Sequence, residues 1–427
     1  MVTLLIIADD FTGALDTGVQ FAASGANTRV VTSADYDFCQ IDPKVQVLVM
    51  DAETRHLNPE EAYNIVYDIS KRAVAQNIPY LYKKTDSALR GNIGSELTAM
   101  LDAAGEKTLS FLPAFPRMNR WTKEGIHYID ELPVHESVFG KDPFEPVTCS
   151  YIPEMIGQQS TVKVIVQAAK DSKAEADEDK VSAQEPAILV WDAQTDHQLE
   201  LSGQYLYETS QLHLTAGCAG FASVLPKLLK LTGENKPDIR FHSSFLMMCG
   251  SVNPITVSQL DYAEQNGFLR IRLEPGERLD EEFWFTPDGQ KKLCELKEAI
   301  RKNTRVILDS NDLPGHDDTK EYALAHGLTL DEIRVRIAKS YGHILKALLE
   351  NDFDSTLMIT GGDTLLGCME QLGVKEMEPI CELAPGTVLS RFLLGSKKYR
   401  IISKSGGFGQ ESLLIDLAQK TSGGSSC

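Results

Sequence analysis

The segment LLIIADDFTGALDTGVQFAASG, residues 4–25, decides the fold class. Its first five residues are all apolar, as expected of a strand that is buried on both faces of a parallel sheet. From Thr12 to Ala23 the apolar residues recur at helical spacing, and Gly25 stands where such a helix would end. A strand, two aspartates and a helix in this order predict the first unit of an α/β fold.

The same alternation of short apolar runs and helical patterns continues along the chain. Asn58-Pro59 and Asn253-Pro254 mark helix starts, because Asn caps a helix and Pro suits its first position. Further strands are expected at residues 45–50, 80–83, 108–112, 162–166, 188–191, 244–248, 269–273, 305–308, 356–359 and 399–403. The alternation predicts a doubly wound α/β fold in which largely parallel sheets are flanked by helices.

The chain of 427 residues is long enough for two or three domains of roughly 100–200 residues each. LTGENKPD, residues 231–238, is a polar connector, and a fresh apolar strand follows it. We therefore expect an N-terminal domain of residues 1–238, a C-terminal domain of residues 239–427 and an active site in the cleft between them. The acidic stretch at 171–180 is interpreted as a solvated helix end or loop.

The composition restricts the partners. A formal net charge of −19 disfavours binding to nucleic acid or to an anionic membrane. The short apolar run at the start is not preceded by Lys or Arg, and none of the eight cysteines forms a CxxC pair. These features predict a cytoplasmic protein with reduced thiols. The oligomeric state stays open, a homodimer included.

Ligands of open α/β sheets bind beyond the carboxyl ends of the strands. In the first half of the chain, charged and hydroxylated residues follow the strands: Asp9, Asp10, Asp51, Arg55, Lys84, Thr85, Asp86, Ser87, Arg90, Arg117 and Arg120. The basic side chains expected to form a local anion site are Arg55, Lys84, Arg90 and Arg117. Asp10 and Asp86 could accept hydrogen bonds from substrate hydroxyls, and either could be a general base. This half therefore predicts a small, polyhydroxylated, anionic ligand.

Simpler interpretations of the same residues remain. An aspartate after a strand is often the N-cap of the next helix, which suits Asp9 better than Asp10 because Thr12 is available to cap. Lys84, Thr85 and Asp86 could form an ordinary solvated turn. His127 and His135 are expected in a long loop after the strand at 108–112 and belong to no histidine cluster.

The second half is rich in glycine at its strand ends. GSVNP (residues 250–254), TGGDT (360–364) and SKSGGFG (403–409) each follow an expected strand. Glycines let backbone N–H groups approach a phosphate, and a helix N-terminus favours an anion. Hydroxyl donors could come from Ser251, Thr360 and Thr364. The Walker A and GxGxxG motifs are both missing, so these turns predict a nucleotide site of another kind.

Several segments together resemble the four-carbon acid sugar kinases, also known as the YgbK-like or DUF1537 proteins. They are ADDFTGALDTGVQFAASG, KKTDSALRGNIGSEL, FLPAFPR with HYIDELPVHES and DPFEPV, GSVNPIT, TGGDT and SKSGGFG. The resemblance runs from about Leu4 to about Leu414. One departure is Asn119 before Arg120 and Thr122, where the family often has Gly-Arg-x-Thr.

The resemblance implies an N-terminal domain for the acid sugar, a C-terminal domain for ATP, and Mg²⁺ on the phosphates. The implied reaction is phosphorylation of the terminal 4-hydroxyl of a tetronate, with D-threonate the first candidate and D-erythronate or 3-oxo-tetronate the alternatives. The residues implied to hold the sugar acid are Asp10, Arg55, Lys84, Thr85, Asp86 and Ser87. Those implied to hold the nucleotide are Ser251, Gly361, Gly362, Asp363, Thr364, Gly406 and Gly407.

Asp86 and Asp10 are the catalytic candidates, and Asp9 is expected to be structural. The metal ligands are not predicted. Two other classes of function remain open: an oxidoreductase that binds its nucleotide cofactor at the glycine turns, and a non-catalytic sugar-acid sensor. The missing GxGxxG motif argues against the first, and ATP consumption with a tetronate would exclude the second.

Overall fold

The computed structural model describes residues 2–142, 145–171, 185–233, 239, 241–350, 353 and 355–422. The chain divides into two compact units, Met1–Asn235 and Lys236–Cys427. Residue 238, after which the domain border is expected, lies outside the described residues, as does all but the first residue of the acidic stretch at 171–180.

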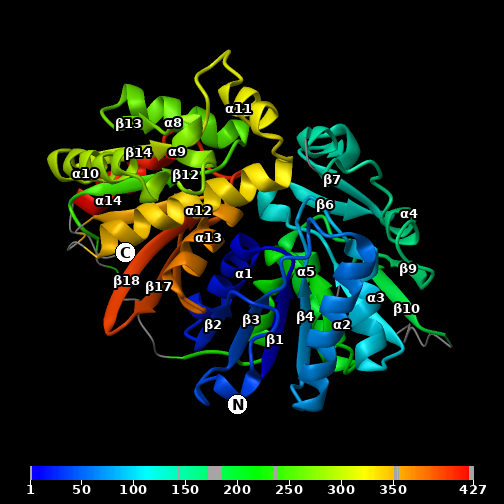
Figure 1. Ribbon diagram of the computed structural model, residues 1–427. Helices are drawn as coiled ribbons and strands as arrows, with labels where there is room; N and C mark the ends of the chain where they lie inside the picture. Colours follow the sequence, from blue (N-terminus) through cyan, green and yellow to red (C-terminus); the bar gives the residue numbers. More distant parts are fainter. Residues whose placement is uncertain are drawn as a thin grey trace. The chain divides into compact units, whose positions relative to one another are not determined.

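The N-terminal unit is built on a parallel sheet (Figure 1). In spatial order its strands are β2 (Thr28–Val31), β3 (Val47–Asp51), β1 (Leu4–Ala8), β4 (Tyr80–Lys84), β11 (Leu214–Gly217), β5 (Thr108–Leu112), β10 (Ala187–Trp191) and β9 (Lys163–Gln167). Every pairing in this order is parallel. The carboxyl ends of β1, β3 and β4 therefore lie next to one another.

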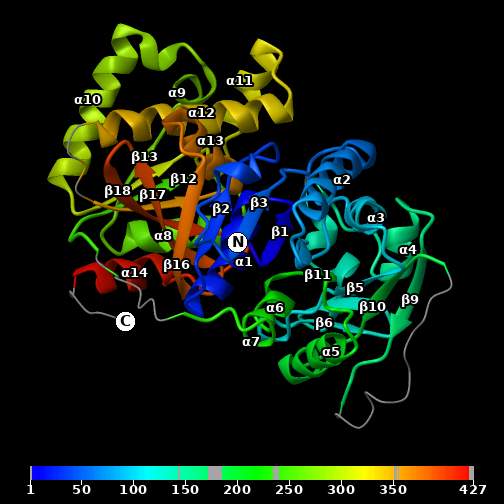
Figure 2. The same ribbon diagram turned by 90° about the horizontal axis from the view of Figure 1, so that it is seen from below.

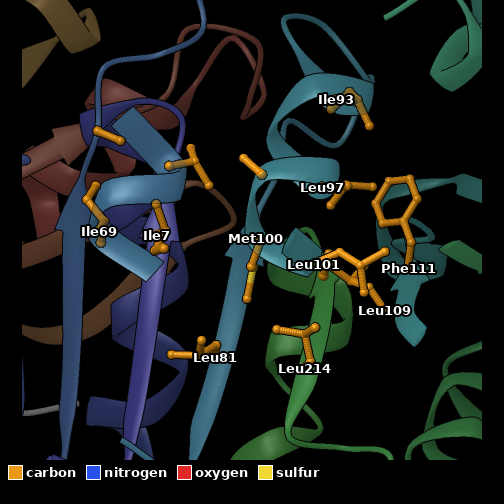
Figure 3. Close-up of a cluster of buried hydrophobic side chains, with 14 of the residues drawn as sticks. Ile7, Ile69, Leu81, Ile93, Leu97, Met100, Leu101, Leu109, Phe111 and Leu214 are labelled. Atoms are coloured by element: carbon orange, nitrogen blue, oxygen red, sulfur yellow. The ribbon is translucent and has the colours of Figure 1, made fainter. Parts of the chain in front are cut away.

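Helices cover both faces of this sheet (Figure 2). They are α1 (Phe11–Ala23), α2 (Pro59–Ala75), α3 (Ile93–Ala104), α4 (Ile152–Gly157), α5 (Asp196–Glu208), α6 (Ala219–Ala222) and α7 (Leu225–Leu228). On one face, Ile69 of α2 and Leu97 and Met100 of α3 join a buried cluster with Ile7 and Leu81 of the sheet (Figure 3). The sheet is thus buried between helical layers, which explains its continuous apolar strands.

After β5 the chain forms a small antiparallel sheet, where the sequence had suggested a long loop. Its strands are β6 (Arg120–Lys123), β7 (Ile126–Ile129) and β8 (Leu132–Pro133). Short 3-10 turns flank it at η2 (Pro116–Met118), η3 (Val134–Glu136) and η4 (Val138–Lys141), and another, η1 (Phe38–Gln40), lies between β2 and β3. Asn119 has φ 53°, a left-handed conformation that Asn tolerates as Gly does. The replacement of the family's usual glycine is therefore compatible with this turn.

The C-terminal unit has its own sheet. Its order is β13 (Leu269–Arg272), β14 (Arg305–Asp309), β12 (Phe245–Cys249), β15 (Thr356–Thr360), β18 (Lys397–Lys404), β17 (Thr387–Leu394) and β16 (Glu376–Ala384). The pairings from β13 to β18 are parallel, whereas β17 pairs antiparallel with both β18 and β16. The sequence did not predict β16 and β17, and the sheet is largely rather than wholly parallel.

Helices also flank this second sheet: α8 (Pro254–Gln265), α9 (Pro275–Leu279), α10 (Pro287–Lys302), α11 (Asp318–His326), α12 (Leu330–Leu349), α13 (Gly362–Leu372) and α14 (Leu413–Ser422), with the 3-10 turn η6 (Phe283–Phe285). Leu260 of α8 and Leu414 of α14 pack with Met247 and Ile402 of the sheet. The expected α/β class with two domains is confirmed. In the described part of the chain, every helix is too short or too polar to span a bilayer.

Candidate active site

Two aspartates at the end of β1 share one arginine. Arg55 donates from Nε to Asp9 Oδ2 at 2.8 Å and from Nη2 to Asp10 Oδ1 at 2.6 Å. Asp9 is 2% exposed. Burial opposes its ionisation, but Arg55 and Lys84 outweigh burial and hold the pKa of Asp9 well below the usual range. Asp9 is therefore an internal counter-ion.

Asp10, not Asp9, is the N-cap of α1. Its Oδ1 accepts from Gly13 N–H at 3.1 Å, and its Oδ2 accepts from the Thr12 hydroxyl at 2.7 Å. The preference for Asp9 as the cap was wrong because the helix begins at Phe11, one residue earlier than expected. Asp10 nevertheless keeps 17% of its side chain exposed, so capping and ligand contact are compatible.

Lys84 brings a buried positive charge to the start of α1. Its Nζ lies 3.6 Å from Asp9 Oδ1, and among the described residues it donates no hydrogen bond. A side chain at Gly13 would collide here, since its Cβ would lie 2.3 Å from Asp10 Oδ1 and 2.6 Å from Lys84 Nζ. Burial opposes the charge, but Asp9 and Asp10 raise the pKa of Lys84. Lys84 is thus a charged group with donors to offer a ligand.

The turn after β4 positions the next three residues. The Thr85 hydroxyl is buried and has no partner among the described residues. Asp86 is held by Arg90, which donates from Nε to Oδ2 at 2.7 Å and from Nη2 to Oδ1 at 3.1 Å. Burial opposes ionisation, but Arg90 and Arg55 hold the pKa of Asp86 well below its usual range. Asp86 is therefore a permanent anion and a weak base.

Ser87 is fixed by the small antiparallel sheet. Its hydroxyl accepts from Arg120 of β6, and its carbonyl oxygen lies 3.0 Å from Nε2 of His127 on β7. The other ring nitrogen, Nδ1, lies 3.0 Å from the Thr122 hydroxyl. Burial lowers the pKa of His127 to about 4, so the ring is neutral at physiological pH. His127, expected in a loop without a role, supports the turn after β4.

Of the four cations expected at this edge, Arg55, Lys84 and Arg90 lie there. Arg120 takes the place of the fourth, Arg117. The guanidinium groups of Arg90 and Arg120 both lie over the Phe139 ring, each 5.2 Å from its centroid. Arg117 instead donates to Gln20 of α1 at 3.2 Å and is exposed. The expectation for Arg117 was wrong because the chain enters β6 at Arg120, which turns that side chain inward.

A second layer of carboxyl groups lies behind Asp10. Asp51 ends β3 and is 1% exposed. Burial, together with the negative charges of Glu53 and Asp10, raises its pKa well above the usual range. Glu53 accepts from the Phe11 N–H at 3.1 Å. Sequence reasoning placed Asp51 at the strand end but gave it no role, because only the fold shows how deeply it is buried.

In the C-terminal unit the glycine turns come together at the carboxyl ends of β12, β15 and β18. A Cβ on Gly250 would lie 1.8 Å from Thr364 Oγ1, and one on Gly406 would lie 2.9 Å from Ser251 Oγ. A Cβ on Gly361 would lie 3.4 Å from Ser251 N. The three turns therefore pack against one another, and Gly250 and Gly406 leave room for the hydroxyls of Thr364 and Ser251.

The start of α13 follows the glycine turn at the end of β15. Gly361 is its N-cap with φ 104°, and no side chain caps the first turn. Gly362, Asp363 and Thr364 form that turn, whose N–H groups have no intrahelical acceptor. Asp363 accepts from Arg334 of α12. Thr360, expected to offer its hydroxyl, donates it instead to the Lys404 carbonyl oxygen at 3.1 Å.

Gly406 and Gly407 lie in the turn after β18, where sequence reasoning overlooked Lys404. This lysine ends β18 and is 0% exposed. Its Nζ donates to the carbonyl oxygens of Ser405 at 3.0 Å and Gly406 at 3.1 Å. The signal was present in the sequence as a charged residue between an apolar strand and a glycine turn.

Comparisons with known proteins agree with the division of the chain into an N-terminal and a C-terminal unit. Residues 4–225 match a family model described as a sugar-binding N-terminal domain, and residues 246–414 match one described as a nucleotide-binding C-terminal domain. A crystal structure of a Salmonella typhimurium LT2 protein superposes with a TM-score of 0.79 at 19% identity, covering 98% of this chain and 100% of that one. Haemophilus influenzae protein HI1011 gives a TM-score of 0.70 at 19% identity, with the same coverage of 98% and 100%. Both likenesses concern the fold.

Curated relatives span nearly the whole chain. The D-threonate kinase of Salmonella typhimurium is 29% identical over 97% of each chain. The D-erythronate kinase of Heliobacterium modesticaldum is 28% identical over 95% of this chain and 94% of its own. The 3-oxo-tetronate kinase of Burkholderia multivorans is 25% identical over 94% of each. With both domain models matched, the chain belongs to the four-carbon acid sugar kinase family.

Proposed function

We propose that this protein is an ATP-dependent kinase that phosphorylates the terminal 4-hydroxyl of a four-carbon sugar acid, with D-threonate as the first candidate. D-Erythronate and 3-oxo-tetronate are the alternatives, and relatives carry all three names. The observation that carries the proposal is the buried Lys84 ammonium, with donors to spare, beside Asp10 and the Thr85 hydroxyl, which has no partner among the described residues. A carboxylate and hydroxyls on one small ligand match these groups.

Lys84 is the group best suited to the substrate carboxylate. Arg55 was expected to share this role, but two of its nitrogens are already bound to Asp9 and Asp10. We infer that Arg55 orients the two aspartates while Lys84 binds the ligand. Thr85 and Ser87 would contact the sugar hydroxyls.

Of the two catalytic candidates, Asp10 is the better base. Both oxygens of Asp86 accept from Arg90, and the depressed pKa of Asp86 makes proton uptake costly. Among the described residues, Oδ2 of Asp10 accepts only from the Thr12 hydroxyl, which can rotate. We therefore assign to Asp10 the proton of the 4-hydroxyl and to Asp86 a hydrogen bond that orients the ligand. Phosphoryl transfer depends mainly on positioning and charge stabilisation, so a strong base is unnecessary.

ATP would bind at the glycine turns of the C-terminal unit, through Ser251, Gly361, Gly362, Thr364 and the pair Gly406-Gly407. Mg²⁺ takes few protein ligands because phosphate oxygens and waters fill most of its shell. The described residues contain no group of three or more His, Cys, Asp or Glu side chains that could hold a metal ion. Asp363, in the first turn of α13, would be the carboxylate that helps to hold it on the phosphates.

The test is ADP release from ATP in the presence of D-threonate, L-threonate, D-erythronate, L-erythronate and the 3-oxo acids, one at a time. The proposal expects ADP to form with at least one tetronate and D-threonate to give the highest kcat/KM. No ADP release above the rate without acceptor would overturn it. Higher kcat/KM for another tetronate would reassign the substrate within the same reaction.

A further inference from the structure

The turn after β18 is held from behind by a buried cation. Lys404 Nζ donates to Thr256 Oγ1 of α8 at 3.1 Å, to Ser405 O at 3.0 Å and to Gly406 O at 3.1 Å. An ammonium has three N–H donors, so all of them are used. Among the described residues no carboxylate forms an ion pair with Lys404. Its charge is therefore balanced only by dipoles, which is costly for a buried group.

Helix α8 holds the same turn from a second side. The Thr256 hydroxyl donates to Gly406 O at 2.9 Å. Gln259 donates from Nε2 to Phe408 O at 3.1 Å and to Gln410 O at 3.0 Å. Most carbonyl oxygens of the turn therefore point into the protein, toward α8 and Lys404.

The orientation of these carbonyls determines what the turn presents on its other side. In a planar trans peptide the C=O and the following N–H point in opposite directions. The N–H groups of Gly406, Gly407 and Gly409 consequently turn away from α8, and the described residues provide no acceptor for them. Successive free N–H groups in a turn form a concave site for an anion.

We propose that Lys404, Thr256 and Gln259 are positioning residues that hold the 405–409 turn in its phosphate-binding conformation, with the Lys404 ammonium as a fixed positive charge behind it. The inference rests on the nucleotide site proposed above. Lys404 does not reach the nucleotide, because its three donors are already occupied within the protein. It acts through the turn, as a bound monovalent cation would.

The charge on Lys404 is sensitive to pH. Burial lowers the pKa of Lys404 to about 8. The titratable group that acts on it is the Cys249 thiol, whose own pKa burial raises to about 12, so the thiol is neutral near pH 8. Loss of the Lys404 proton removes one of three donors and the positive charge, and the turn should then bind phosphate less tightly.

The test is calorimetric binding of a non-hydrolysable ATP analogue without sugar acid. Lys404→Met and Thr256→Val should each weaken binding roughly tenfold, the cost of losing a buried hydrogen bond to a charged group. Thr256→Ser keeps the hydroxyl and should bind as wild type. Lys398→Met makes the same change at the exposed end of β18 and should have no effect. Between about pH 7 and about pH 9.5, wild-type affinity should fall while that of Lys404→Met stays low and flat.

Wild-type affinity in both Lys404→Met and Thr256→Val, or parallel pH profiles of wild type and Lys404→Met, would overturn the inference. If Lys404→Met does not fold, the difference in analogue affinity between Thr256→Val and Thr256→Ser tests the inference alone. Wild-type protein that binds the analogue but phosphorylates no tetronate would contradict the proposed reaction and leave this inference standing. Wild-type protein that does not bind the analogue would overturn the inference.

Discussion

Arg55 and Asp10 are joined by a short ion pair, with Nη2 of Arg55 2.6 Å from Oδ1 of Asp10. The same guanidinium binds Asp9 at 2.8 Å, so the end of β1 and the segment after β3 are locked together before any ligand arrives. Two carboxylates this close repel each other unless a cation lies between them. The main role of Arg55 is therefore structural: its positive charge holds Asp9 and Asp10 together.

Replacing Arg55 by Met should destabilise the fold by about 3–5 kcal/mol, because the buried carboxylate of Asp9 loses its hydrogen-bonded partner and keeps only the more distant ammonium of Lys84. Urea unfolding measures the change. The double variant Arg55→Met with Asp9→Asn should recover part of the loss, since the buried carboxylate that Arg55 paired with is then removed. A single variant as stable as wild type would show that Arg55 does not balance Asp9.

Asp10→Asn should reduce kcat by roughly 10²–10⁴ while leaving stability nearly unchanged. Asn caps a helix about as well as Asp, and its side-chain oxygen can still accept from Arg55, which stays paired with Asp9. The helix α1 therefore keeps its start, while the proposed base is removed. Asp10→Ser is the matched control, with a capping side chain and no carboxylate, and should be equally inactive. Steady-state kinetics and thermal unfolding test both. Full turnover in either folded variant would rule out Asp10 as the base.

Asp51→Asn should stabilise the protein at neutral and alkaline pH. The folded pKa of Asp51 is raised, so its contribution to stability is present below its unfolded pKa of about 3.9 and is lost as pH rises through the folded pKa. In the wild type the Glu53 N–H donates to Asp51 Oδ1 at 3.3 Å. The side-chain oxygen of Asn can still accept this hydrogen bond. Urea unfolding from about pH 4 to about pH 8 should show the variant gaining on wild type as pH rises. A constant difference would contradict the raised pKa.

Gly361→Ala should weaken nucleotide binding, because φ 104° at the N-cap of α13 strains any L side chain and shifts the first turn. Gly373→Ala is the control. It strains the other end of the same helix, at φ 67°, where a Cβ would have open space. Both changes should cost about 1 kcal/mol of stability. Calorimetry should show weaker nucleotide binding only for Gly361→Ala, and equal affinities would argue against the glycine-turn site.

Much of the fold was predictable because it depends on local patterns. Asn58-Pro59 and Asn253-Pro254 begin α2 and α8 as expected. Leu4–Ala8 and Thr108–Leu112 are strands with the expected bounds. Strands β16 and β17 were missed, since Glu376–Ala384 mixes charged residues and a proline with apolar ones, and such a strand is stabilised by its hairpin partner rather than by its own pattern.

The site was harder to predict where it depends on contacts between distant residues. The sequence placed Lys84 at a strand end but could not show that its ammonium lies 3.6 Å from Asp9, in space that any side chain at position 13 would fill. The choice between Arg117 and Arg120 depended on where β6 begins. Lys404 looked like an ordinary strand end, and only its burial shows that the glycine turn is built around it.

The most direct test of the proposed reaction is the product made from D-threonate and ATP. Phosphorus and proton NMR of the reaction mixture should show one phosphate ester on the terminal carbon, with ADP formed in equal amount. Ester formation at the 2- or 3-hydroxyl, or ATP hydrolysis without a sugar ester for every tetronate, would contradict the assignment of this protein as a four-carbon acid sugar 4-kinase.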